Sequence, residues 1–211
     1  MSSVTGMTTG RMEAFSDGVI AILITVMVLE LPVPHGPDWG ALRHALPVLV
    51  TYLMSFVYLG IYWNNHHHML QATRRVTGLI LWANLHLLFW LSLIPFTTAW
   101  LGENHFAPTP AAGYGIVLLI AALAYFALQR AIIHDQGSQS LVATAVGRDL
   151  KGKASPLLYA TGIGLSFVNR WLAVAVYAAV ALMWLIPDRR LERTIIRQAQ
   201  AGQTATGEEN P

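Results

Sequence analysis

The chain has 211 residues, of which 55% are hydrophobic and only 11% are charged, and its formal net charge is +2. A water-soluble domain carries about 25% charged residues, so this composition excludes a soluble globular protein and indicates an integral membrane protein. The absence of cysteine excludes disulfides and thiolate metal sites.

Long apolar stretches predict an all-α membrane protein, because a spanning helix needs roughly 17 to 25 apolar residues. Six spans are expected, over residues 12–31, 43–64, 76–101, 107–130, 154–169 and 171–187. They form one transmembrane domain over residues 11–190, between a segment of residues 1–10 and a polar tail of residues 191–211 that we expect to be disordered. No soluble catalytic domain is left, so we do not expect an enzyme.

The distribution of basic residues predicts the orientation. With six spans and the N-terminus inside, eleven of the thirteen Lys and Arg residues fall in inner segments, and only Arg43 and Arg170 fall in outer loops. Basic loops stay in the cytoplasm, so both termini are expected there and the protein in the inner cell membrane. Because these residues are spread over the loops as orientation signals, we expect no nucleic-acid partner.

The first span is unusual because it contains Asp17 and Glu30, which leave only residues 18–29 uncharged. At 1.5 Å per residue this uncharged core is about 18 Å long, against about 30 Å of hydrocarbon. A helix with a carboxylate inside the membrane turns that face toward protein or water. We therefore expect this helix at the centre of an assembly, with Glu30 at its outer mouth.

One side of the first span is apolar. At about 100° per residue, Phe15, Ile22 and Leu29 lie on one line, flanked by Thr25 and Val26. This line is either a packed seam between helices or the lining of a narrow pore, in which hydrophobic rings gate by dewetting. Both interpretations stay open on the residues alone. Ser16 and Asp17 point elsewhere, toward neighbouring helices.

Histidines gather near the end of the second span, as His66, His67 and His68, and His86 lies in the third. A metal- or haem-binding transporter using His66, His67 and His86 is therefore an alternative function. Adjacent histidines point about 100° apart on a helix, and no cysteine or nearby carboxylate completes a ligand set, so we predict no metal site and no cofactor. His66 or His67 is instead expected to bond to Asp17, because a buried carboxylate needs a partner.

The third span contains two residues that interrupt its apolar pattern. Asn84 is expected to make an interhelical hydrogen bond, and Pro95 is expected to kink or end the helix. No Ser-His-Asp arrangement, phosphate-binding Gly loop or pair of catalytic carboxylates can be assembled from the chain. The chain thus offers no catalytic motif, in agreement with the expectation that it is not an enzyme.

Three motifs combine to suggest a family. They are R-x-x-x-F-S-D at residues 11–17, W-x-N-H-H at residues 63–67, and N-L followed by P-F-x-T-A-x-L-G-E within residues 84–103. This set resembles the prokaryotic branch of the transmembrane protein 175 family, whose animal members are lysosomal potassium channels. The resemblance implies a homotetramer in a lipid bilayer that conducts potassium ions through a central pore lined by the first helix, without a T-V-G-Y-G filter.

The resemblance also implies roles for residues of the first span. The family's bulky constriction, seven residues after the motif Phe, falls on Ile22, and further rings fall on Val26 and Leu29. Thr25 falls where a threonine is associated with potassium preference in some relatives.

The family pairs the F-S-D motif with the Trp and His of the second helix. We hypothesise that this pairing holds the pore helix in register through bonds of Arg11, Ser16 and Asp17 to Trp63, Asn65 and His66. Phe15 is the remaining residue of the R-x-x-x-F-S-D motif, and His67 is the remaining residue of the W-x-N-H-H motif.

Overall fold

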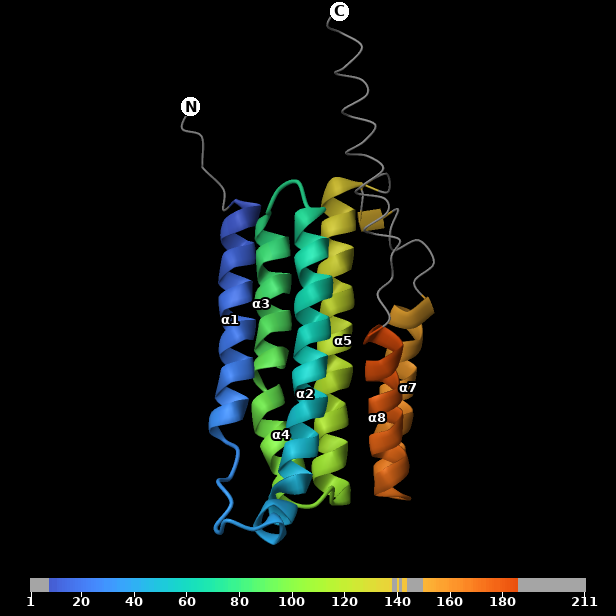
Figure 1. Cartoon of the computed structure of the whole chain (residues 1–211). Helices are drawn as coiled ribbons and strands as arrows, with labels where there is room; N and C mark the ends of the chain where they lie inside the picture. Colours follow the sequence, from blue (N-terminus) through green and yellow to red (C-terminus); the bar gives the residue numbers. More distant parts are fainter. Residues whose placement is uncertain (1–7, 138–139, 141, 144–149, 186–211) are drawn as a thin grey trace, which may run out of the picture.

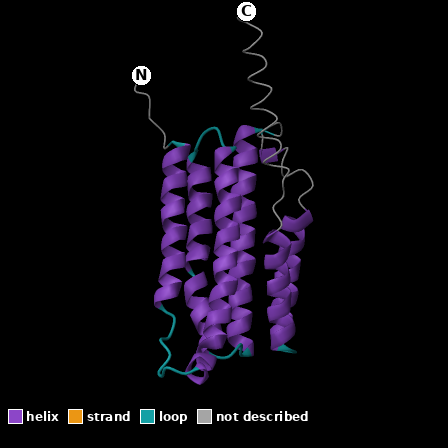
Figure 2. Ribbon diagram, viewed as in Figure 1, coloured by secondary structure: helices purple, strands orange, loops and turns teal. Residues whose placement is uncertain are grey.

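The computed structural model describes residues 8–137, 140, 142–143 and 150–185. Its regular elements there are all α-helices, which confirms the predicted all-α class (Figure 1, Figure 2). Their bounds are α1 Thr9–Leu29, α2 Trp39–Gln71, α3 Gly78–Ser92, α4 Ile94–Glu103, α5 Pro108–Gln136, α7 Leu150–Ser166 and α8 Arg170–Leu185. The tail for which disorder was predicted, residues 191–211, lies outside the described residues.

The helices run side by side along one axis, with α1 at one edge of the bundle and the shorter α7 and α8 at the other (Figure 1). Four helical segments are long and apolar enough to cross a membrane: α1, α2, α3 together with α4, and α5. With 17 and 16 residues, α7 and α8 are shorter. The start of α1, the α2–α3 connection and the end of α5 lie at the same end of the bundle (Figure 1).

Helix α2 is longer than the predicted span of residues 43–64. Its 33 residues begin after Asp38, whose carboxylate accepts from the Ala41 N–H at 2.8 Å and caps the helix. At 1.5 Å per residue the helix is about 50 Å long, so its ends extend beyond a bilayer core. Hydropathy underestimated its length because the W-N-N-H-H-H segment at residues 63–68 is polar and still helical.

The third predicted span is broken into α3 and α4 at Leu93, as the Pro95 prediction implied. Proline has no N–H to continue the helical ladder, and its ring crowds the carbonyl four residues earlier. After the break, Gly102 brings α4 against α2. A Cβ at Gly102 would lie 2.8 Å from the Cα of Val48 and 2.6 Å from the Oγ1 of Thr51. This contact needs glycine.

A cluster of buried tyrosines joins α2, α5, α7 and α8. The Tyr58 hydroxyl donates to the Tyr177 carbonyl at 2.6 Å, and the Tyr177 hydroxyl donates to the Ala111 carbonyl at 3.2 Å. Gly115 and Gly162 leave room for the Tyr177 ring, since a Cβ on either would overlap it. Buried tyrosines combine a large apolar area with a satisfied hydroxyl, so this side of the bundle is a closely packed scaffold.

Candidate functional site

Helix α1 presents an apolar face outward. Phe15, Ile22 and Leu29 are 50%, 60% and 82% exposed, which is the line predicted from the helical repeat. The opposite face is buried against α2, α3 and α4 and carries Met12, Ser16, Ile20, Leu23 and Met27. Val26 is only half-buried and lies on the flank, so the structure does not align it with Ile22 and Leu29.

Small and polar residues separate the bulky side chains of this exposed face. Ala14, Gly18 and Ala21 are all exposed there, and small residues of this kind let membrane helices approach closely. Thr25 is also exposed, and its hydroxyl donates to the Ile22 carbonyl at 2.9 Å. The threonine oxygen thus lies on the exposed side with its proton already bonded to the helix.

A buried polar network attaches the inner side of α1 to its neighbours. The Asn84 amide on α3 donates to the Ser16 hydroxyl at 2.9 Å, and its carbonyl oxygen lies 2.7 Å from Nε2 of His66 on α2. Ser16 itself donates to the Met12 carbonyl at 2.8 Å. Ser16, Asn84 and His66 are completely buried, so one amide on α3 bonds to polar groups of two other helices in an apolar environment.

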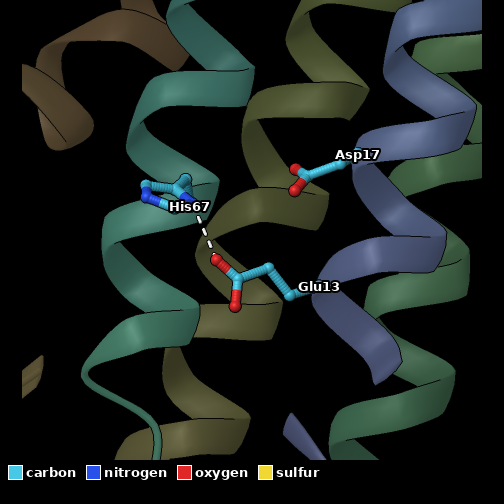
Figure 3. Close-up of side chains that lie close together, drawn as sticks. All are labelled: Glu13, Asp17 and His67. Atoms are coloured by element: carbon cyan, nitrogen blue, oxygen red, sulfur yellow. Dashed lines mark ion pairs between the residues drawn. The ribbon is translucent and has the colours of Figure 1, made fainter. Parts of the chain in front are cut away.

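A second pair of contacts lies beside this network and is more exposed. The Trp63 indole N–H donates to the Asp17 carboxylate at 3.0 Å, and Nδ1 of His67 lies 2.7 Å from Oε1 of Glu13. Both carboxylates are on α1 and both partners are on α2; Figure 3 shows Glu13, Asp17 and His67 on the facing sides of the two helices. The Trp63 and His67 rings stack, with centroids 5.9 Å apart.

The expected pairings of the two motifs differ from these contacts in detail. His66 contacts Asn84 rather than Asp17. The Asn65 side chain donates to the carbonyl of Ile61 in its own helix at 2.8 Å, so it does not bond to α1. Arg11 lies exposed in the first turn of α1, where, among the described residues, its side chain does not join the network.

The histidines of the alternative transporter hypothesis do not converge. His66 contacts Asn84, His67 contacts Glu13, and His86 is exposed with its ring edge-on to Trp90, at a centroid separation of 6.4 Å. The one group of potential metal ligands found among the described residues is instead Glu13, Asp17 and His67. Sequence reasoning missed Glu13, although its position four residues before Asp17 places both on one helix face.

An ion pair lies at the end of the bundle where α1 begins, outside the apolar part of the helices. Arg75, in the α2–α3 connection, donates from Nε and a terminal nitrogen to both oxygens of Asp135 at 2.8 and 3.1 Å. These hydrogen bonds and the charge of the carboxylate raise the pKa of the Arg75 guanidinium above its ordinary value. The pair joins the loop after α2 to the end of α5.

Comparison with known proteins places this arrangement in a family. The family described as endosomal/lysosomal potassium channel TMEM175 matches residues 11–95. A protein named as a potassium channel from Chryseobacterium sp. (strain P1-3) is 52% identical over 189 residues, which are 90% of this chain and 98% of that protein. The chain belongs to the TMEM175 family. Another similar protein, from Streptomyces collinus, is named as a potassium channel and is 34% identical, over 83% of this chain and 90% of its own length.

A solved TMEM175 structure has the same fold. It is described as the crystal structure of a lysosomal potassium-selective channel TMEM175 homolog from Chamaesiphon minutus. The two structures align with a TM-score of 0.74 at 31% identity, covering 85% of this chain and 97% of that one. The TMEM175 match over residues 11–95 covers α1 from its third residue on, together with α2 and α3, and therefore every residue of the polar network.

Proposed function

We propose that this chain is one of four identical subunits of a potassium-favouring cation channel in the inner cell membrane, with both termini in the cytoplasm. Six membrane-crossing segments per subunit are part of this proposal. Support comes from relatives at 52% and 34% identity that are named as potassium channels, and from the solved homologue described as potassium-selective. Passive conduction of this kind requires no cofactor and no chemical step.

The observation that carries the proposal is the exposed apolar face of α1. Only 22% of the most apolar stretch of α1 is buried, against 44% of the corresponding stretch of α5. The same helix carries Glu13, Asp17 and Glu30 and has a short uncharged core, which makes it a poor helix to face lipid. Copies of α1 around a central axis would cover this face, and the small residues Ala14, Gly18 and Ala21 would permit their close approach.

The constriction is assigned to the bulky residues of that face. Four copies of Ile22 form the narrowest ring, and Leu29 forms a second ring nearer the outer end. Val26, half-buried on the flank, contributes less to the lining. A ring of this kind closes when water leaves it and opens when a small rotation or outward shift of α1 lets water return.

Polar groups near these rings favour cations. The Thr25 hydroxyl donates its proton to the Ile22 carbonyl, so its lone pairs can accept from ion-bound water or contact the ion. Glu30 is exposed at the C-terminal end of α1, where its negative charge raises the local cation concentration at the outer mouth.

The test is a flux assay in liposomes that contain the purified protein and an outward potassium gradient. Passive potassium exit builds up an opposing voltage, so sustained flux is expected only when a protonophore carries compensating charge. Protein-free liposomes and a sodium gradient of equal size are the controls. Absence of protonophore-dependent potassium flux, or saturable flux that proceeds without the protonophore, would count against a channel.

A further inference from the structure

Three side chains that conduction does not use converge between α1 and α2. Glu13 and Asp17 of α1 and His67 of α2 each offer one ligand atom, and these atoms lie within 4.8 Å of one another (Figure 3). Within the part of the chain that the structure describes, no other group of three such ligands was found. The group lies near the start of α1, at the end of the bundle that also holds the α2–α3 connection (Figure 1).

The contacts inside this group leave one of its polar atoms without a hydrogen bond among the described residues. Nδ1 of His67 is shielded from solvent and lies 2.7 Å from Oε1 of Glu13, yet this contact lies outside hydrogen-bond geometry. Glu13 and Asp17 are four residues apart on one helix, a spacing at which two negative charges repel each other. A bound cation would remove that repulsion and give the imidazole nitrogen a partner.

The surrounding groups already orient two of the three ligands. The Trp63 indole N–H donates to Oδ1 of Asp17, which leaves Oδ2 available. Nε2 of His67 lies 2.9 Å from the side-chain amide of Gln71. The atom of Gln71 at this distance is the amide nitrogen, which donates to Nε2. An ion bound at Nδ1 would place the ring proton on Nε2, and a rotation of the Gln71 amide would then let its oxygen accept that proton. Outer contacts of this type are what hold histidine and carboxylate ligands in metal sites.

We propose that Glu13, Asp17 and His67 form a binding site for a divalent transition metal ion of the Zn²⁺ type. One imidazole nitrogen and two carboxylate oxygens are a common set for such ions, with water completing a tetrahedron. Ligand atoms around a tetrahedral Zn²⁺ lie about 3.4 Å apart. Side-chain rotations would therefore widen the 2.7 Å separation of Nδ1 and Oε1 and bring the Asp17 carboxylate, within 4.8 Å of both, to the same distance. The side chains of Glu13 and His67 are 22% and 31% exposed, which lets an ion enter from water.

Occupancy of the site cross-links α1 to α2. The ion would add a bond between the two helices beside the Asp17–Trp63 contact and fix the rotation of α1 about its axis. The binding itself is independent of conduction, whereas any effect on the pore rests on the proposed channel function.

The experiment is a Zn²⁺ titration by calorimetry on purified, chelator-treated protein in detergent. One Zn²⁺ per chain is expected for the unaltered protein. Glu13→Gln and His67→Gln should each weaken binding by more than about tenfold, because each removes a ligand. The matched controls are Glu30→Gln, a carboxylate at the other end of the same helix, and His86→Gln, an exposed histidine on α3; both should bind as the unaltered protein does.

Two results would overturn the site: no saturable binding up to millimolar Zn²⁺, or binding whose affinity is unchanged in Glu13→Gln and His67→Gln. Melting curves without metal establish that the variants are folded, and added Zn²⁺ should raise the melting temperature of the unaltered protein only when the ligands are intact. Neither readout involves ion flux. A failed titration therefore leaves the channel proposal standing, and absent flux leaves the metal site standing.

Discussion

The two edges of the helix bundle are held together in different ways. At the α7 and α8 edge, the Tyr177 ring fills space that Gly115 and Gly162 leave free, and its hydroxyl and carbonyl are both hydrogen-bonded. At the other edge, α1 buries one face along its length against α2, α3 and α4, with its polar contacts near its first turns, and leaves the opposite face exposed. Packing on all sides resists displacement in every direction, whereas a helix packed on one face has no neighbour within the subunit on its other face. The bundle therefore combines a closely packed scaffold with one helix that keeps a whole face available for contacts outside the subunit.

The largest effect is expected from the exposed side of α1. Ile22→Asn should raise potassium leak through liposomes several-fold, because a polar side chain would let water remain in the proposed Ile22 ring. Since Ile22 is 60% exposed in the subunit, the melting temperature should change little. Ile22→Leu keeps the ring apolar and is the control for flux.

The same change two residues earlier tests the other side of the helix. Ile20 is fully buried, so Ile20→Asn places an amide in an apolar contact and should lower the melting temperature strongly. Unchanged flux in Ile22→Asn, or equal loss of stability in the two variants, would contradict the assignment of these faces.

The scaffold edge should be intolerant of added volume. Gly162→Ala forces a methyl group into the Tyr177 ring and should cost about 1–3 kcal/mol of unfolding free energy. Gly164→Ala on the same helix is the matched control, since nothing lies within 4 Å of its added Cβ and alanine favours the helix. Thermal melting in detergent measures both. If the Gly162→Ala protein were as stable as the Gly164→Ala protein, the Tyr177 ring could move aside at little cost, which would contradict close packing of the tyrosine cluster.

The attachment of α1 should depend on one amide. Asn84→Ala leaves the buried Ser16 and His66 without their shared partner and should cost about 1–2 kcal/mol. Hydrogen exchange of the α1 amides should rise more than that of α5 or α7. Asn65→Ala is the control, because that side chain bonds only to Ile61 of its own helix. Equal exchange increases across the bundle would show that Asn84 supports the whole fold.

The smallest effect is expected at the surface ion pair. Arg75 is well exposed and Asp135 much less so, and exposed pairs contribute little to stability and are screened by salt. Arg75→Gln should lower the melting temperature slightly at low salt and not at high salt. Arg74→Gln is the control, since only the backbone of Arg74 contacts Gln136. A large decrease in melting temperature that does not depend on salt would contradict this expectation and show that the Arg75–Asp135 pair contributes substantially to stability.

Helical periodicity was sufficient to find the exposed line of α1, because Phe15, Ile22 and Leu29 repeat every seven residues and the helix is regular over that length. Hydropathy likewise located the apolar core of each helix. It could not locate the ends of α2, since polar residues such as Asn64 and His68 remain helical without adding hydropathy.

Hydrogen-bond partners were harder to predict than faces. A buried carboxylate needs a donor, but periodicity does not decide whether Trp63 or His66 supplies it; their relative depth depends on how far α2 slides along α1. Asn84 was expected to bond between helices, yet its role as a bridge among three of them depends on the packing of α3. Asn65 had an alternative partner in its own helix, the Ile61 carbonyl, and the local bond prevailed.

The break at Leu93 divides one membrane-crossing segment into two parts with different attachments. The α3 half carries Asn84 and so is joined to α1 through Ser16. The α4 half is locked to α2 by Gly102 and by the bond between Thr98 and Ser55. Helix α1 also packs against α4, so both halves contact it, but only the α3 half does so through the buried amide. Pro95, which has no N–H to continue the helical ladder, therefore lets each half take the direction that its own partner helix requires.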